Sequence, residues 1–170
     1  GMVRDPYGAK MSKTKGNVVD PLEVAAVLGA DALRFALLHG SDPTADQKMS
    51  ETRLEGSRNF ANKLWNAARF VVNSRPAEIA AAAPLEPPPA DQRGPAEHWI
   101  LERCRLTVEQ VERAYTDLDF GDVTRLLYDA IWNEFCDWYV ELAKVRLADE
   151  SLSAETREAT WWALVQALDT

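Results

Sequence analysis

The fold class of this chain is decided by the stretch SETRLEGSRNFANKLWNAARFVVN, residues 50–73 of 170. Ser50 is a typical residue at a helix N-cap, and the apolar side chains after it recur at intervals of three and four. This spacing predicts one long helix from about Glu51 to Asn73. The residues expected on its buried face are Ser57, Phe60, Ala61, Leu64, Ala68, Val71 and Val72.

The part of the chain after Pro95 has the same helical character. It contains no further proline and a single glycine, Gly121, and its apolar residues recur at helical spacing. We expect one helix that ends before Gly121 and a second over about 122–147. A third helix should begin after its N-cap, Ser153, and we expect it to be truncated. The residues expected on one side of the second helix are Leu127, Ile131, Phe135, Trp138 and Leu142.

Short elements are expected before residue 50. Asp20 and Pro21 are an N-cap and a first-turn residue, and Gly29 is a typical stop, so a short helix should lie between them. A second short helix is expected over about 31–38. Strand signals are nearly absent, except around residues 1–3.

Six of the nine prolines lie in residues 76–95, which predicts an extended connector because proline interrupts helices. The sequence therefore predicts an all-α helical bundle with a loop-rich N-terminal appendage. We expect the appendage to span residues 1–42 and the bundle residues 43–170.

Composition excludes several classes of protein. No apolar run approaches the roughly 20 residues that span a bilayer, and the N-terminus lacks the apolar stretch of a signal peptide. Cys104 and Cys136 lie far apart, and with only His39 and His98 they are too few and too scattered for a structural zinc site. We expect no membrane contact, no metal site and a cytoplasmic location.

Charge is distributed unevenly along the chain. The net charge is −8, but residues 1–75 carry +3 and residues 76–170 carry −11. A uniformly acidic protein would repel nucleic acid, whereas a basic N-terminal part allows one local site for a polyanion.

Three lysines gather in the segment KMSKTKGN, residues 10–17. Lys10, Lys13 and Lys15 lie between two glycines and just before a capped helix. Ammonium groups, a hydroxyl and flexible main-chain amides suit a polyphosphate whose charge shifts during a reaction. A solvated basic loop is the alternative interpretation.

A polar stripe runs along the predicted helix at residues 51–73. Its members recur at steps of three or four residues, and they are Asn59, Asn62, Asn66, Arg69 and Asn73. Amide side chains offer donors and acceptors together, which suits base edges as well as internal hydrogen bonds, and both interpretations stay open. Arg58 and Lys63 add charge that could reach phosphate.

Residues 1–40 closely resemble the end of the catalytic domain of class I aminoacyl-tRNA synthetases, with their mobile Lys-Met-Ser-Lys-Ser loop. Two further segments, SRNFANKLWNAARFV at 57–71 and LYDAIWNEFCDWYVELAK at 127–144, are similar to the valyl members of that class. The resemblance implies activation of the amino acid by ATP, with Mg²⁺, and transfer to the 3′ end of tRNA(Val).

The resemblance also implies roles for individual residues. Lys10 and Lys13 would stabilise the pyrophosphate side of ATP, with Met11 and Ser12 shaping the loop. Thr14 stands where the family has serine; it keeps the hydroxyl and adds a methyl group, so modest tuning is expected.

The bundle of this family reads the anticodon of tRNA. The candidate contacts are Asn62, Asn66, Arg69, Arg58, Trp138 and Asn133. Splayed RNA bases are recognised by hydrogen bonds and by stacking on aromatic rings, which is why a tryptophan is among them.

The chain lacks the family's paired histidines, a Rossmann-like alternation of strands and helices, and an editing insertion. We therefore expect a C-terminal piece of a larger, monomeric enzyme that is inactive alone, with valine and ATP as substrates of the full-length protein. The alternatives are a helical protein-interaction module without an RNA role and the same region of an isoleucyl- or leucyl-tRNA synthetase.

Overall fold

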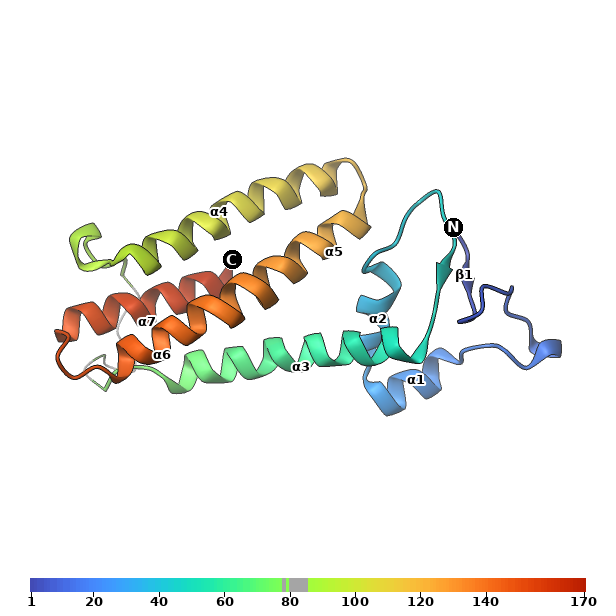
Figure 1. The fold of residues 1–170 in the computed structure, drawn as a ribbon, viewed down its shortest axis with the longest axis horizontal. Helices are drawn as coiled ribbons and strands as arrows, with labels where there is room; N and C mark the ends of the chain where they lie inside the picture. Colours follow the sequence, from blue (N-terminus) through green and yellow to red (C-terminus); the bar gives the residue numbers. More distant parts are fainter. Residues whose placement is uncertain (78, 80–85) are drawn as a thin grey trace. The chain divides into compact units, whose positions relative to one another are not determined.

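The structure, a computed structural model, describes residues 1–77, 79 and 86–170 (Figure 1). Its α-helices are α1 (Pro21–Leu28), α2 (Ala30–Leu38), α3 (Glu51–Asn73), α4 (Pro95–Thr116), α5 (Phe120–Tyr128), α6 (Val140–Ala148) and α7 (Ala154–Asp169). The other elements are strands β1 (Val3–Arg4) and β2 (Gln47–Lys48), 3₁₀ helices η1 (Lys13–Lys15) and η2 (Ala90–Gln92), and the π-helix η3 (Asp129–Tyr139). This content confirms the predicted all-α class.

The expected helix boundaries agree closely with those observed. Asp20 accepts a hydrogen bond from the main-chain nitrogen of Leu22 and caps α1, and Ser153 caps α7 in the same way. Residues 78 and 80–85 of the expected connector lie outside the described residues, and its described part contains η2 and the first residue of α4, Pro95.

Two compact units divide the chain. Unit 1 comprises residues 1–63 and 110–128, and unit 2 comprises residues 64–109 and 129–170. These boundaries fall inside α3 and α4, so they do not test the expected division between residues 42 and 43, which stays a prediction.

Unit 1 is built around a small apolar cluster of Ala36, Met49 and Leu54. The two short strands pair in parallel, with Val3 opposite Gln47. Arg53 of α3 donates from Nε to the carbonyl oxygen of Ala36 (2.9 Å), and a second of its nitrogens donates to His39. One guanidinium group therefore satisfies carbonyls at the C-terminal end of α2 that the helix leaves unpaired.

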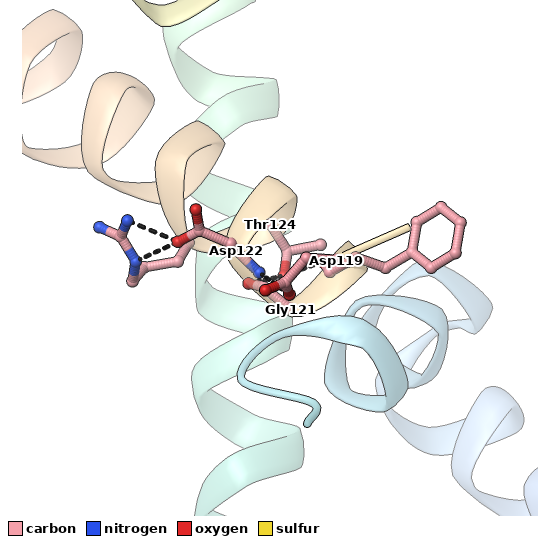
Figure 2. A network of polar contacts seen from close by, with 6 residues as sticks. Asp119, Gly121, Asp122 and Thr124 are labelled. Carbon is pink, nitrogen blue, oxygen red and sulfur yellow. Dashed lines mark hydrogen bonds and ion pairs between the residues drawn. The ribbon is translucent and has the colours of Figure 1, made fainter. Parts of the chain in front are cut away.

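The start of α5 is fixed by close backbone contact in unit 1. The Asp119 carboxylate accepts from the main-chain nitrogen of Asp122 (3.0 Å) and caps the first turn (Figure 2). Gly121 is buried, and a Cβ at this position would lie 1.9 Å from the carbonyl oxygen of Ser41. Only glycine permits this approach of two backbone segments.

Unit 2 has the larger apolar core. Helices α3, α4, η3, α6 and α7 contribute to it, and the most deeply buried of its large side chains are Tyr139, Ile100, Leu164 and Val71. The Trp161 indole donates from Nε1 to the carbonyl oxygen of Val71 (2.8 Å). Cys136 is buried and Cys104 half-buried against this core, and burial raises the pKa of the Cys104 thiol.

Part of the predicted helix faces was wrong. On α3, Leu64 and Val72 are exposed, whereas Leu54 and Ala67 are buried. In the segment expected as one helix over about 122–147, Phe135 is buried and Trp138 is 64 % exposed, so these two residues do not share one side as expected. The π-helix η3 explains this difference, because its wider turns break the 3.6-residue spacing from which the common side was predicted.

Candidate functional site

The lysine loop, residues 10–16, has a defined backbone in unit 1. Ser12 caps η1 by accepting a hydrogen bond from the main-chain nitrogen of Lys15, and Gly16 ends it in the left-handed region, with φ of 67°. Lys10 and Lys13 are exposed, whereas Met11 is half-buried against the apolar cluster of unit 1.

The loop's cations are available to a ligand. Within the part of the chain that the structure describes, Lys10, Lys13 and Lys15 take part in no ion pair. Thr14 is exposed, and its hydroxyl lies 2.9 Å from that of Ser12. The arrangement presents three ammonium groups to solvent from a short, capped turn, which suits a polyphosphate.

Two residues that the sequence-based prediction missed support this loop. Asp5 is 6 % exposed, and its carboxylate accepts a hydrogen bond from the Asn17 amide (2.9 Å). Asn17 in turn accepts from the main-chain nitrogen of Ser12 (2.9 Å). The Asp-Pro-Tyr-Gly sequence at residues 5–8 was the available signal, since aspartate commonly opens a turn by binding main-chain amides.

The polar stripe of α3 is exposed. In unit 2 its members lie with two apolar side chains in what we call the α3 stripe, comprising Trp65, Asn66, Arg69, Val72 and Asn73. The other members of the polar stripe, Asn59 and Asn62, are exposed in unit 1. Trp65 is 67 % exposed, which places a large aromatic ring among amide and guanidinium groups in solvent. Such a mixture of stacking and hydrogen-bonding groups is typical of surfaces that bind single-stranded nucleic acid.

A hollow of about 550 Å³ lies in unit 2 beside the C-terminal end of α3. Its charged lining residues are Arg75, Lys144, Arg157 and Glu150, and Phe70 and Asn73 lie beside them. The Lys144 ammonium lies 5.4 Å from the centre of the Phe70 ring, and the Arg75 guanidinium lies 5.3 Å from that of Trp161.

We call this feature the basic hollow. Its lining carries three cationic side chains and one carboxylate, within a unit whose sequence carries a net charge of −7, and the Lys144 ammonium also donates to the Glu141 carboxylate (2.7 Å). Cationic side chains that line a hollow are suited to a phosphate group. The sequence-based prediction did not single out these residues, because they lie far apart along the chain. Lys144 follows Arg75 by 69 positions, and Arg157 follows it by 82.

The other predicted anticodon contacts are dispersed. Trp138 is exposed on η3, and Leu142 and Val145 of α6 are exposed as well. Asn133 is also exposed, and its amide donates to the Asp129 carboxylate (3.2 Å). Arg58 is half-buried in unit 1.

Glu134, another polar residue of η3, is already paired. Its two carboxylate oxygens accept from Arg103 of α4 at 2.9 and 2.6 Å. This bidentate pair raises the pKa of the Arg103 guanidinium. Glu134 therefore links two helices of unit 2.

Comparisons with known proteins agree with this geometry. Residues 1–50 match the family described as tRNA synthetases class I (I, L, M and V), and residues 97–170 match the anticodon-binding domain of tRNA ligase. The chain belongs to the class I aminoacyl-tRNA synthetases.

The curated relatives of this chain include valine–tRNA ligases. The chain is 50 % identical to a valine–tRNA ligase of Dehalococcoides mccartyi over 89 % of its own length, and 43 % identical to that of Lactobacillus johnsonii over 99 %. It spans only 16 % and 19 % of the length of these two relatives.

A solved structure shares the fold. The agnB2 LeuRS of Agrobacterium radiobacter K84, crystallised in a ternary complex with tRNA and LeuAMS, aligns with 99 % of this chain with a TM-score of 0.66. The alignment covers 20 % of that chain, and the sequence identity is 21 %.

Two features are absent from the described residues. These residues include no helix that is long and apolar enough to cross a membrane. They also include no group of three or more His, Cys, Asp or Glu side chains that could hold a metal ion.

Proposed function

We propose that this chain is the part of a valine–tRNA ligase that supplies the ATP loop and the anticodon-binding bundle. The single observation that carries the proposal is the 50 % identity with a valine–tRNA ligase over 89 % of the chain. The full-length enzyme would activate valine with ATP and Mg²⁺ and transfer it to tRNA(Val). Its monomeric state and cytoplasmic location stay predictions.

In this proposal the lysine loop acts during the formation of valyl-adenylate. Negative charge shifts toward the leaving pyrophosphate as the carboxylate of valine attacks the α-phosphate. Lys10 and Lys13, exposed and without ion pairs among the described residues, would neutralise that charge. Ser12 would hold the turn, and Thr14 would tune it through its hydroxyl contact with Ser12.

The α3 stripe would read the anticodon. Asn66 can offer both a donor and an acceptor to a base edge, and Trp65 or Trp138 can stack on a splayed base. Asn62 and Asn133 extend the polar surface along their own helices. Arg58 would contribute charge within unit 1.

The basic hollow supports the same proposal. Arg69 and Asn73 of α3 recur one helical turn apart, and Asn73 lines the hollow itself. Phosphates of the anticodon loop could therefore be neutralised next to the residues that contact the bases. Phosphate contacts set the affinity and the register, and base contacts set the sequence preference.

Binding of this chain to two RNA stem-loops tests the proposal. One carries a valine anticodon, the other differs only in the anticodon bases, and both are measured at the same salt concentration, because phosphate contacts depend on salt. We expect tighter binding of the first. Equal binding of both would contradict anticodon reading, and no binding would favour a protein-interaction module.

The full-length ligase tests the amino-acid assignment. The expected result is ATP–pyrophosphate exchange that depends on valine. Dependence on isoleucine or leucine instead would assign the chain to one of the neighbouring synthetases and contradict the proposal.

A further inference from the structure

The base of the lysine loop is tied by two side chains that the proposed function does not use. One oxygen of the buried Asp5 carboxylate accepts from the main-chain nitrogens of Tyr7 (3.1 Å) and Ala9 (2.7 Å). The other accepts from Nδ2 of Asn17 (2.9 Å). One carboxylate therefore joins the segment before the lysines to the segment after them.

The Asn17 amide continues this connection into the loop. Its Oδ1 accepts from the main-chain nitrogen of Ser12 (2.9 Å), and its Nδ2 also lies 3.3 Å from the carbonyl oxygen of Lys10. A primary amide can donate two hydrogen bonds and accept others, whereas a carboxylate only accepts. Asn17 is thus chemically matched to a carboxylate on one side and to a main-chain donor and acceptor on the other.

These contacts fix the main chain on both sides of Met11. Lys10 immediately precedes Met11. Ser12 immediately follows Met11 and caps the turn that carries Lys13. The lysine side chains are exposed and keep their rotamer freedom, so their main chain is what the fold can place in advance. Charge stabilisation in a transition state depends on such prior placement.

We propose that Asp5 and Asn17 are positioning residues for the ATP step, and that their hydrogen-bonded pair, the Asp5–Asn17 strut, holds Lys10 and Lys13 in place for the polyphosphate. The inference rests on the proposed function of the lysine loop. Neither Asp5 nor Asn17 contacts ATP in this account; both act through the lysines.

The electrostatics of Asp5 agree with this role. The hydrogen bond from Asn17 is the largest cause of a lowered pKa at Asp5, and the main-chain donors add to it despite the opposing effect of burial. The carboxylate is therefore ionised near neutral pH, where an ionised acceptor makes the stronger hydrogen bond with the amide.

Amide hydrogen exchange of this chain tests the strut without reference to ATP. In Asn17→Ala the Ser12 amide loses its acceptor, and we expect its hydrogen exchange to accelerate by about tenfold. The matched control is Asp42→Asn, because Asp42 accepts from the main-chain nitrogen of Thr44 (2.7 Å) in a turn outside the loop. An unchanged exchange rate at Ser12 in Asn17→Ala would overturn the strut.

ATP–pyrophosphate exchange by the full-length ligase tests the positioning role. We expect Asn17→Ala and Asp5→Asn each to lower kcat by about tenfold to a hundredfold, with KM for valine unchanged. The double variant Asp5→Asn/Asn17→Asp restores a carboxylate–amide pair in the reverse sense, and should recover about tenfold over either single variant. Asp42→Asn should keep the wild-type kcat.

Two results would overturn the positioning role. One is a loop that exchanges its amide hydrogens faster in Asn17→Ala while kcat keeps its wild-type value. The other is a double variant that is no more active than the single ones. A wild-type kcat in Lys13→Ala would instead contradict the proposed function of the loop. It would not affect the hydrogen-exchange test of the strut, because that test does not involve ATP.

Discussion

The lysine loop and the core of unit 2 obtain their shapes from different forces. The loop is held by side chains that bind main-chain atoms, chiefly Asp5, Ser12 and Asn17. Unit 2 is held by buried apolar side chains from α3, α4, η3, α6 and α7. A loop without a large core can change shape locally, whereas a packed helical core responds as a whole.

The α3 stripe differs from both the lysine loop and the core of unit 2. Its polar side chains are exposed and do not determine the shape of the helix, because the buried face of α3 does that. Substitutions in the core should therefore change stability, those in the loop should change local order, and those in the stripe should change affinity alone.

The largest expected effect is in the interior of unit 2. Glu97 is fully buried, and its Oε1 accepts from Arg146 (3.0 Å) and from the Thr160 hydroxyl (2.8 Å). Arg146→Ala would leave that carboxylate buried and uncompensated, which we expect to lower the free energy of unfolding by about 3 kcal/mol. Urea unfolding would measure the loss. The control is Arg105→Ala, because Arg105 pairs with Glu102 in solvent and should cause no measurable loss.

A smaller effect on stability is expected where α5 begins. In Gly121→Ala the new methyl group would collide with the Ser41 carbonyl oxygen, and we expect unit 1 to lose about 1–3 kcal/mol. Gly56→Ala is the matched control, because its Cβ would meet nothing within 4 Å inside α3 and should stabilise the helix by about 0.5–1 kcal/mol. Thermal unfolding would measure the melting temperatures of both variants. Equal melting temperatures of Gly121→Ala and Gly56→Ala would contradict the close contact.

The stripe should respond through affinity without a change in structure. We expect Asn66→Ala and Arg69→Ala each to weaken binding of the valine anticodon stem-loop by about tenfold, since in the proposed function each side chain contacts RNA. Only Arg69→Ala should also reduce the dependence of affinity on salt, because it alone removes a charge. Wild-type affinity in both variants, with unchanged circular dichroism, would contradict the residue assignments.

The smallest effect is the response of the loop to acid. Because the pKa of Asp5 is lowered from its ordinary value of 3.8, its hydrogen bonds are fully present above that value and are lost as the pH falls through the lowered pKa. We expect the loop signals in NMR spectra to stay unchanged from neutral pH to about pH 5 and to shift only below the ordinary value. In Asp5→Asn this transition should vanish.

Much of the fold follows from local sequence signals. Asp20, Pro21 and Gly29 define α1, and Ser50 and Ser153 mark the start of α3 and α7, because caps and breakers act within one helical turn. The exposed side of α3 was also predictable, since isolated polar residues at helical spacing define a solvent face.

What the sequence could not supply depends on contacts between distant segments. The basic hollow joins Arg75 to Lys144 and Arg157, and Asn17 reaches Asp5 across the lysine loop. The different burial of Phe135 and Trp138 could not be predicted, because the π-helix η3 breaks the 3.6-residue spacing on which the predicted face rests. The roles predicted for the loop lysines, by contrast, rest on the resemblance of residues 1–40 to a known family.

The most direct test of the account compares Lys13→Ala with Asn66→Ala in the full-length ligase, measuring valine-dependent ATP–pyrophosphate exchange and the KM for tRNA(Val). We expect Lys13→Ala to lower the rate of pyrophosphate exchange by about a hundredfold and to leave the affinity for tRNA unchanged. Asn66→Ala should do the reverse, raising KM for tRNA by about tenfold with normal pyrophosphate exchange. A Lys13→Ala enzyme with wild-type pyrophosphate exchange would contradict the central claim.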